Sequence, residues 1–395
     1  MSRSILHCDM NNFYASVECM LDPALRKYPV AVCGSVEERH GIVLAKNYAA
    51  KAFDVKTGDA VWQAKQKCRN LVVVPPHFEE YIKYSKLARS VYSRYTDQVE
   101  PYGMDECWLD VSGTEHIFGS PEKVANDIRE TIKFELGLTI SVGVSFNKIF
   151  AKLGSDMKKP DAVTVISREN FKEKIWGLPV SDLLFAGRKT TEKLRSCGIC
   201  TIGDAAVCSA ETLERLLGKN GLELKRYALG EDNSPVSRQN EKSAPKSIGR
   251  SVTRRTDFKT PDEIWGMFLK LAREISDSLR EHGLYAGGVQ VHIRNASLSV
   301  REYSRSFPDS VNGAKAIAER GMNLLREHFN FAEPLRSVGL RAINLKDCQT
   351  AVQEDIFGES EKQETEEKIE DSIYKLRKKF GSTAITRAAE DKKEN

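Results

Sequence analysis

The chain has 395 residues with 41% hydrophobic and 29% charged residues, and its 60 Lys and Arg nearly balance its 56 Asp and Glu, leaving a net charge of +4. This globular composition and a length above roughly 250–300 residues predict two or three domains. The sequence has no run of 18 apolar residues, no apolar signal core near its start and nine scattered Cys, which excludes a membrane-spanning helix and indicates a reducing cytoplasm, without secretion or a disulfide framework.

The first 166 residues alternate between short apolar runs and amphipathic segments. Strands are predicted at 4–8, 28–33, 42–45, 72–74, 99–102, 106–111, 138–144 and 163–166. Helices are predicted at 13–20, 47–53, 79–95, 125–135 and 147–158, the last of them ended by Pro160. This order indicates an α+β sheet domain with an insertion.

The rest of the chain divides into a helical module, a linker, a second sheet domain and a tail. Segments 178–194 and 202–217 are predicted to be helical, and the Ser-rich stretch 237–247 is predicted to be a linker. Strands at 247–254, 288–294, 300–306 and 338–345 and helices at 261–282 and 310–328 then follow in β-α-β-β-α-β order. This order predicts one sheet with helices on one face. The tail is highly charged and has one helix-like segment, 366–380.

The positive charge is concentrated near the linker. Between residues 238 and 259 the chain has seven Lys or Arg and two acids. From residue 347 to the end it has 13 acids and 9 bases, so the tail carries −4 and the rest of the chain +8. A local basic excess is expected where a protein contacts a phosphate backbone, although a solvated basic linker has the same composition.

Three carboxylates suggest a metal site. Asp9 ends the first strand, and Asp105 and Glu106 lie in the turn of the predicted hairpin. Strand ends of one sheet can bring such groups together, and without a His or Arg beside them they repel one another unless a divalent cation binds. Oxygen ligands select Mg²⁺ or Mn²⁺, and two such ions suit nucleotidyl transfer. Taken alone, the Asp-Glu pair is also consistent with an ordinary surface turn.

Six sequence runs together resemble a known family. The runs HCDMNNFYASVE, AKNYAAKAFDVKTG, YGMDECWLD and NKIFAKLGSDMKKP occur in this order in the first 160 residues, and PKSIGRSVT and LRSVGLRAINL follow at 245–253 and 335–345. They resemble the successive motifs of the Y-family, or translesion, DNA polymerases, especially the bacterial DNA polymerase IV branch. The resemblance covers roughly residues 1–346.

The resemblance implies a right-hand, multidomain α+β fold. The parts would be a palm with an antiparallel sheet and helices at 1–12 and 78–168, small fingers at 13–77, an all-helical thumb with a helix-hairpin-helix at 169–237, a linker at 238–246, a β-α-β-β-α-β little finger at 247–346 and a flexible acidic tail at 347–395.

The resemblance also implies a catalytic centre. Asp9, Asp105 and Glu106 would be the catalytic carboxylates and, with the carbonyl of Met10, the ligands of two Mg²⁺ ions, for which Mn²⁺ could substitute. Asn11 stands where the family often has Asp, at a position that is not a ligand. Tyr14 matches the steric gate, an aromatic ring under the sugar that excludes a 2′-hydroxyl, and Phe13 would pack beneath the same nucleotide. An isolated Phe-Tyr pair would otherwise be ordinary core packing.

Other matched positions would bind the nucleotide. Tyr48, Lys51 and Lys159 match residues that hold the triphosphate. Lys51 is commonly Arg in relatives, and Lys keeps the charge but loses the bidentate fork. The roof over the nascent base pair would comprise Gly34, Ile42, Leu44 and Gly58, in which the two aliphatic side chains could add bulk.

Predicted DNA contacts occur in three regions. They are Lys148 and Lys152 in the last palm helix, Gly187 in the thumb hairpin, and Arg250, Arg254, Arg294, Arg336 and Arg341 in the little finger. Backbone amides at a helix N-terminus and arginines beside strands suit phosphates and position a duplex without reading its sequence. Phe185 replaces what is often the first Gly of the hairpin. The pair Cys197 and Cys200 spells C-x-x-C, which we interpret as a chance occurrence and not as a zinc or redox site.

The tail carries a candidate partner motif. Gln353, Ile356 and Phe357 resemble the short peptide with which bacterial polymerases bind the sliding clamp. The resulting hypothesis is a monomeric, cytoplasmic, template-directed DNA polymerase of low fidelity and without proofreading, acting on primer-template DNA and dNTPs in damage tolerance. The alternatives are a catalytically silent DNA- and clamp-binding adaptor and a nucleotide cyclase. The three retained carboxylates argue against the adaptor, and the helix-hairpin-helix and the basic last domain argue against the cyclase.

Overall fold

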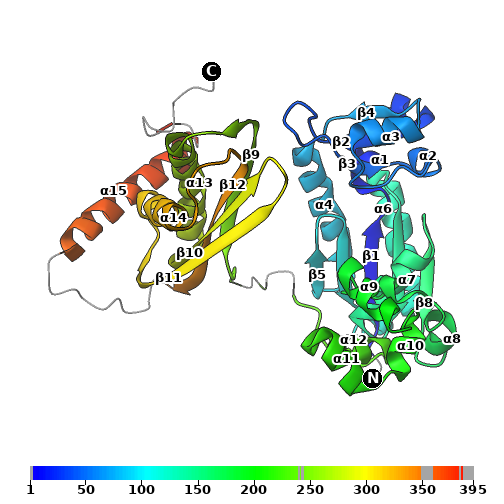
Figure 1. The fold of residues 1–395 in the computed structure, drawn as a ribbon. Helices are drawn as coiled ribbons and strands as arrows, with labels where there is room; N and C mark the ends of the chain where they lie inside the picture. Colours follow the sequence, from blue (N-terminus) through cyan, green and yellow to red (C-terminus); the bar gives the residue numbers. More distant parts are fainter. Residues whose placement is uncertain (1–2, 239–240, 242–243, 348–358, 382–383, 386–395) are drawn as a thin grey trace. The chain divides into compact units, whose positions relative to one another are not determined.

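The computed structural model describes residues 3–238, 241, 244–347, 359–381 and 384–385. The chain forms two compact units (Figure 1). One comprises the chain up to Val36 together with His40–Glu241, and the other comprises Glu37–Arg39 and the chain from Lys242 onward. Among the helices that are described, none is long and apolar enough to cross a membrane.

The first unit is built on a five-stranded sheet in the order β5-β6-β1-β7-β8. Its strands are β1 (Ile5–Met10), β5 (Val99–Tyr102), β6 (Glu106–Asp110), β7 (Ile140–Ser145) and β8 (Val163–Ile166). The central strand β1 is antiparallel to both β6 and β7, and all six of its residues are buried. The sheet is antiparallel as expected except at one edge, where β7 and β8 are parallel because the helix between them carries the chain back across the sheet.

Helices cover both faces of this sheet. They are α1 (Phe13–Leu21), α4 (Phe78–Tyr92), α5 (Glu115–Phe118), α6 (Pro121–Leu136) and α7 (Lys148–Met157). Leu6 and Cys8 of β1 join the core beneath α4 and α6, whereas Ile5 packs with Ala151 of α7 on the other face. Because side chains alternate along a strand, Asp9 lies on the same face as Ile5, the α7 face.

A small three-stranded sheet packs beside this core. It has the order β3-β2-β4, with β2 (Val30–Cys33) antiparallel to β3 (Val43–Lys46) and parallel to β4 (Val72–Val74). A 3₁₀ turn at Pro23–Lys27 and the helices α2 (Tyr48–Lys51) and α3 (Val61–Lys67) accompany it. Its apolar residues form a separate small cluster around Ala31 and Val43.

The helical module differs from its prediction. Its elements are α8 (Phe171–Ile175), a 3₁₀ turn (Val180–Asp182), α9 (Arg188–Ser196), α10 (Ile202–Val207), α11 (Ala210–Leu217) and α12 (Lys219–Ala228). The single helix expected at 178–194 is wrong in its first half, because Phe185 adopts a positive φ of 70° and Gly187 caps α9. The second expected helix is split at Ser209, whose side chain caps α11, and α12 was not predicted.

The second unit has the predicted β-α-β-β-α-β order. Its elements are β9 (Ile248–Phe258), α13 (Pro261–His282), β10 (Leu284–Asn295), β11 (Val300–Val311), α14 (Ala314–His328), β12 (Leu335–Asp347) and the tail helix α15 (Glu359–Phe380). The sheet order is β11-β10-β12-β9 with antiparallel neighbours. Both α13 and α14 pack on one face of this sheet (Figure 1), around a core that includes Phe268 and Val291.

Candidate active site

Strand pairing brings two of the predicted carboxylates together. Asp9 of β1 is directly opposite Glu106 of β6 in the register. Asp105 precedes β6, and its carbonyl accepts a hydrogen bond from the N–H of Met10 at 3.0 Å. The turn before it is made at Gly103, whose φ is +80°. Glu106 is the first residue of β6, where the strand expected at 106–111 begins, and this places its side chain beside that of Asp9.

Two lysines of the α7 region contact these carboxylates. Lys152 Nζ lies 3.0 Å from Glu106 Oε1 and 3.5 Å from Asp9 Oδ2, and Lys159 Nζ lies 2.8 Å from the same Asp9 oxygen. The Asp156 carboxylate forms an ion pair with each of the two lysines, with N···O distances of 3.0 Å. The sequence provided reason to expect no His or Arg beside the carboxylates, but two lysines lie there because α7 crosses the sheet face to which Asp9 and Glu106 point.

A buried histidine completes the surroundings of Glu106. His7 is fully buried, and its Nε2 lies 3.3 Å from Glu106 Oε2, without hydrogen-bond alignment. Its Nδ1 lies 2.8 Å from Ser155 Oγ of α7. Sequence reasoning missed both residues. No local pattern distinguishes them, because their relation to Glu106 depends on long-range strand pairing and on the packing of α7.

The carboxylates differ in their electrostatic surroundings. Burial, together with the charges of Asp9 and Glu106, raises the pKa of Asp105 to about 6. Burial also raises the pKa of Asp9, despite the opposing charges of Lys159 and Lys152. For Glu106, burial alone would raise the pKa, but His7 and Lys152 outweigh it and lower the pKa to about 2. Of the three carboxylates, that of Asp105 is therefore the one whose negative charge is least balanced by nearby positive charge.

The donor chemistry of this site fits a divalent cation. Three carboxylates at one sheet end supply the hard oxygen ligands that Mg²⁺ and Mn²⁺ prefer, and the raised pKa of Asp105 indicates uncompensated negative charge. Within the described ranges, no three His, Cys, Asp or Glu side chains converge into a ready-made ligand cage. Asp9 and Glu106 turn instead toward the lysines, and Asp105 makes no ion pair with any residue that the structure describes.

Tyr14 lies in an aromatic stack next to the carboxylates. Its ring stacks on Tyr81 with centroids 4.2 Å apart and planes 8° apart, and its hydroxyl donates to Met104 Sδ at 3.2 Å. Burial, and then the charge of Asp105, raises the pKa of Tyr14. Phe13 is buried in the core of the sheet. The structure thus places Tyr14 near Asp105 and leaves Phe13 beneath it.

Behind the stack lies a polar cluster that the sequence did not reveal. Tyr81 is fully buried, and its hydroxyl donates to Glu18 Oε1 in a very short contact. His77 Nδ1 lies 2.9 Å from the same oxygen. Burial and the hydrogen bond to Glu18 raise the pKa of Tyr81 well above its ordinary value. This anchoring fixes the ring on which Tyr14 stacks.

Two of the predicted triphosphate residues, Tyr48 and Lys159, lie near Asp9. Tyr48 is the first residue of α2. Burial raises the pKa of its hydroxyl, the nearby charge of Lys159 lowers it and that of Asp9 raises it. Lys51 Nζ lies 5.6 Å from the centre of the Tyr48 ring. In the predicted roof, Ile42 is 45% exposed, and Gly34 could not carry a Cβ because the carbonyl oxygen of His40 would lie 2.3 Å from it.

Asn11 supports the turn that carries Lys159. Its Oδ1 accepts the N–H of Asp161 at 2.9 Å, and its Nδ2 donates to Ser141 Oγ at 2.9 Å. The Asp161 carboxylate in turn lies 2.7 Å from Arg129 and 2.8 Å from Lys133 of α6. Both ends of the Asn11 amide are thus used in holding this turn.

The predicted DNA contacts of the first unit have different surroundings. Lys148 Nζ lies 2.6 Å from Glu100 and over the Trp108 ring, so its charge is already paired, as is that of Lys152. Gly187, at the N-cap of α9, has open space around it. Phe185 beside it is 64% exposed.

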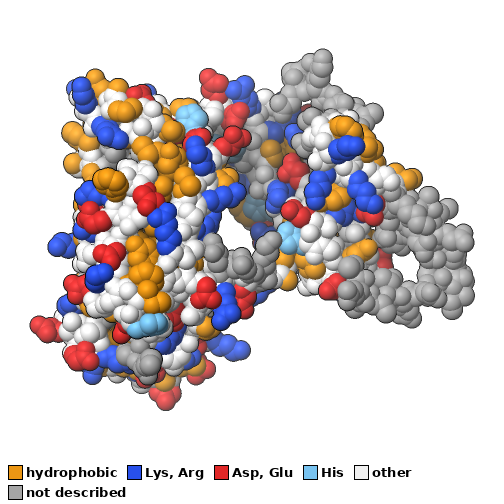
Figure 2. All heavy atoms as spheres, turned by 180° about the vertical axis from the view of Figure 1, so that it is seen from behind, with side chains coloured by type: hydrophobic (Ala, Val, Ile, Leu, Met, Phe, Trp, Pro, Cys, Tyr) orange, Lys and Arg blue, Asp and Glu red, His pale blue; other side chains and the backbone are white. Residues whose placement is uncertain are grey.

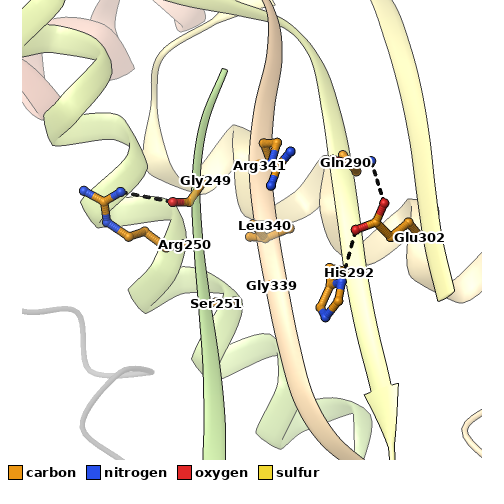
Figure 3. A pocket seen from close by; sticks show the side chains of 9 residues that line it. All are labelled: Gly249, Arg250, Ser251, Gln290, His292, Glu302, Gly339, Leu340 and Arg341. Atoms are coloured by element: carbon orange, nitrogen blue, oxygen red, sulfur yellow. Dashed lines mark hydrogen bonds and ion pairs between the residues drawn. The ribbon is translucent and has the colours of Figure 1, made fainter. Parts of the chain in front are cut away.

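In the second unit the arginines divide between two faces. Arg341 is opposite Gln290 in the register and lies with it on the open face of the sheet, around a hollow of about 270 Å³ (Figure 3). Arg250 is opposite the core residue Leu340 and turns toward α13, where it lies 3.4 Å from Glu274. Arg254 also approaches α13, at 3.9 Å from Glu263.

The surroundings of the remaining predicted residues are as follows. Arg294 is opposite Ser337 and donates to the carbonyl of Leu298 at 3.3 Å, and Arg336 is partly exposed. Cys197 and Cys200 are exposed free thiols. On the face shown in Figure 2, basic and acidic side chains are interspersed, and no patch of one sign covers either unit. The clamp-peptide residues Gln353, Ile356 and Phe357 lie outside the described residues.

Comparisons with known proteins agree with this architecture. Residues 8–156 match the model of the impB/mucB/samB family, and residues 245–356 match the model of that family's C-terminal domain. The chain is 47% identical to DNA polymerase IV of Acetivibrio thermocellus, covering 98% of this chain and 97% of the relative. It is 38% identical to DNA polymerase IV 1 of Bacillus subtilis, covering 100% and 94%. The fold matches a Y-family DNA polymerase chimera, Dbh-Dpo4(243-245)-Dbh, with a TM-score of 0.77 at 24% identity, over 87% of this chain and 99% of the chimera.

The fold is that of a Y-family DNA polymerase, in which an α+β sheet unit carries the carboxylates and a second sheet unit follows a helical module. The chain belongs to the impB/mucB/samB family, in its DNA polymerase IV branch, and is a DNA-directed DNA polymerase.

Proposed function

We propose that this polymerase extends a primer at Asp9, Asp105 and Glu106 and tolerates damaged templates, with low fidelity and without proofreading. The observation that carries the proposal is the register pairing of Asp9 with Glu106, with Asp105 in the adjoining turn. When bound there, two Mg²⁺ ions would activate the primer hydroxyl and stabilise the leaving pyrophosphate.

The side chains of the site would divide the work of the reaction. Asp9, Asp105, Glu106 and the carbonyl of Met10 would hold the ions, and Glu106 would lie nearest the primer 3′ hydroxyl. Lys159 would bind the triphosphate together with Tyr48 and Lys51. Two observations support this role: Lys159 lies beside Asp9, and Asn11 holds the turn that follows Lys159. Lys is a compact point charge, so Lys51 would hold phosphate without the bidentate geometry of Arg.

Tyr14 would exclude ribonucleotides by contact with the 2′-hydroxyl. Its stacking on the anchored Tyr81 supports this role, because a gate must resist displacement by the sugar. Phe13 would pack beneath the same nucleotide. Gly34, Ile42, Leu44 and Gly58 would form the roof over the nascent base pair.

Each structural part would have a separate function in handling DNA. We assign the palm to 1–12 and 78–168, the fingers to 13–77, the thumb to 169–237 and the little finger to 247–346. In the thumb, Gly187 would allow a phosphate to approach the N-terminus of α9. In the little finger, Arg341 on the open sheet face is a better phosphate contact than Arg250 or Arg254, which already lie near carboxylates of α13. A monomer in the cytoplasm, with Gln353–Phe357 as a clamp-binding peptide, completes the proposal.

The test is primer extension with purified protein, primer-template, dNTPs and Mg²⁺. Asp105→Ala should abolish extension while DNA affinity stays within about twofold of wild type. Asp127→Ala, the same change on the exposed surface of α6, is the matched control and should retain full activity. Extension by Asp105→Ala at the wild-type rate would contradict the assignment, and inactivity of the wild-type protein with intact DNA binding would favour the adaptor alternative.

Sugar selection tests the gate directly. Tyr14→Ala should increase incorporation of ribonucleotides relative to deoxynucleotides, and Tyr14→Phe, which keeps the ring, should not. Equal sugar discrimination in all three proteins would refute the role of Tyr14. Repeating extension opposite damaged templates, with and without a bacterial clamp, tests lesion tolerance and the tail peptide.

A further inference from the structure

Glu106 is contacted at both carboxylate oxygens by groups shielded from water. Lys152 Nζ lies 3.0 Å from Oε1, and His7 Nε2 lies 3.3 Å from Oε2. The exposed fractions of these side chains are 13% for Lys152 and 0% for His7. Asp105, by contrast, has no described cationic partner, so the two adjacent carboxylates are held to very different degrees.

The contact between His7 and Glu106 joins two buried atoms that are otherwise unsatisfied. Neither His7 Nε2 nor Glu106 Oε2 has a hydrogen-bond partner among the described residues. Buried polar atoms in native proteins nearly always find a partner, and each of these two atoms is the nearest candidate for the other. A small rotation of the carboxylate would align them and satisfy both.

The orientation of His7 is fixed by the elements around it. It lies on β1, opposite Trp108 and Gly143 in the two registers, and its ring meets the Trp108 ring edge-on at 5.2 Å. Its other nitrogen, Nδ1, lies 2.8 Å from Ser155 Oγ. Gly143 lets the backbone of α7 approach closely enough for Ser155 to reach the ring.

The proton of a neutral His7 can lie on either ring nitrogen, and the position depends on both Ser155 and Glu106. The serine has one hydroxyl proton and two acceptors in reach, His7 Nδ1 and the carbonyl oxygen of Lys152 at 2.7 Å. If it donates to the carbonyl, Nδ1 must carry the imidazole proton and Nε2 turns a lone pair toward the Glu106 carboxylate. If it donates to Nδ1, Nε2–H points at Glu106 Oε2. The negative charge of Glu106 favours the second arrangement.

We propose that His7 is a positioning residue that orients the Glu106 carboxylate through an Nε2–H···Oε2 hydrogen bond, with the Ser155 hydroxyl donating to Nδ1. The proposal rests on the proposed role of Glu106 in the catalytic centre. A catalytic carboxylate must be held within about 0.5 Å of its productive position, and partners of metal-binding carboxylates serve this purpose.

The test compares His7→Leu, which removes the donor, with His7→Gln, which keeps an N–H at similar reach. His7→Leu should lower kcat for single-nucleotide incorporation about 10- to 100-fold, the usual effect of losing such a partner. The KM for dNTP and the affinity for primer-template should stay within about twofold. His7→Gln should recover most of kcat.

A second measurement does not depend on turnover. Mn²⁺ affinity of the protein on primer-template, measured by titration calorimetry, should fall about 10- to 100-fold in His7→Leu and recover in His7→Gln. Ser145→Ala removes another buried hydroxyl of the same sheet, one that donates to the carbonyl of Ile166 at 2.8 Å, and it should change neither kcat nor Mn²⁺ affinity.

The outcomes separate this inference from the proposed function. Equal losses in His7→Leu and His7→Gln, or an unchanged Mn²⁺ affinity in both, would overturn the positioning role. If His7→Leu does not fold, Ser155→Ala keeps the ring and removes the hydroxyl that donates to Nδ1, and wild-type kcat and Mn²⁺ affinity in that variant would overturn the inference. Full activity of Glu106→Ala would instead show that the proposed function of Glu106 is wrong.

Discussion

A single methyl group at Gly143 should disturb both the fold and the active site. Gly143 lies on β7 directly beneath α7, and a Cβ there would stand 1.9 Å from the carbonyl oxygen of Ala151 and 2.5 Å from the backbone nitrogen of Ser155. Ordinary van der Waals contact begins near 3.4 Å. Gly143→Ala therefore requires α7 to move away from the sheet by more than 1 Å, because both clashing atoms belong to its backbone.

The size of the effect follows from this displacement. Overpacking a core typically destabilises a protein by about 1–3 kcal/mol, and each kcal/mol lowers the unfolding midpoint by about 2–4 °C in a unit of this size. We expect Gly143→Ala to lower the midpoint by about 2–12 °C. Because α7 carries Lys152 and Ser155, we also expect a loss of kcat on the order of 100-fold, the effect of a misplacement of about 1 Å.

Two glycine variants calibrate this prediction in calorimetry and single-nucleotide extension. At Gly154 a Cβ would lie 3.2 Å from the Cα of Gly143, so Gly154→Ala should show a smaller change in the same direction. At Gly177 nothing lies within 4 Å of the added Cβ, so Gly177→Ala should resemble wild type. A midpoint within 1 °C of wild type and a kcat within twofold for Gly143→Ala would refute the argument that close packing of α7 builds the site.

Three further changes test the supports of the site. Asn11→Ala should raise the KM for dNTP several-fold with little change in kcat, since it frees the turn that carries Lys159, and steady-state kinetics will show this split. Partial burial alone would raise the pKa of Asp161, but the hydrogen bonds from α6 lower it. Its contribution to stability is therefore present at neutral pH and lost as pH falls below the ordinary value of 3.8, so urea unfolding should show Asp161→Asn less stable by up to about 1 kcal/mol at pH 7, with the difference shrinking in acid. Tyr81→Phe keeps the ring beneath Tyr14 and should preserve sugar discrimination, whereas Tyr81→Leu should relax it, as competition between ribonucleotides and deoxynucleotides will show.

The second unit could be predicted closely because its boundaries are local. The helix expected at 261–282 matches α13, which is started by the Thr260 cap and Pro261 and ended by Gly283 in a left-handed conformation. The helical module could not be predicted as well, because a 3₁₀ turn at Val180–Asp182 and a non-helical stretch precede α9 within the segment expected to be helical. Phe185 adopts a positive φ there, a conformation that only tertiary packing imposes on such a residue.

The approach of Asp9 to Glu106 could be predicted from the sequence, but the contacts of their side chains could not. The run around Asp9 and the hairpin around Glu106 point to a carboxylate centre, yet nothing local shows which face α7 presents to them. Lys152 was expected to contact DNA, and the structure pairs it with Glu106. His7 and Tyr81 gave no signal, because a buried His or Tyr in an apolar run is ordinary and its partner lies about 60 to 100 residues away.

The charges of the site show why a cation is still needed after the lysines are counted. Asp9, Asp105, Glu106 and Asp156 carry four negative charges when ionised, and Lys152 and Lys159 supply two positive charges, so two negative charges remain. The two remaining negative charges would be neutralised by one divalent cation. The remaining charge is centred on Asp105, the carboxylate with a pKa raised to about 6, so a first cation that bound at the proposed site would displace no lysine there. A second cation would have to compete with Lys159 for Asp9. Because the phosphates of an incoming nucleotide attract the same lysine, nucleotide binding and a second cation should favour each other at this site.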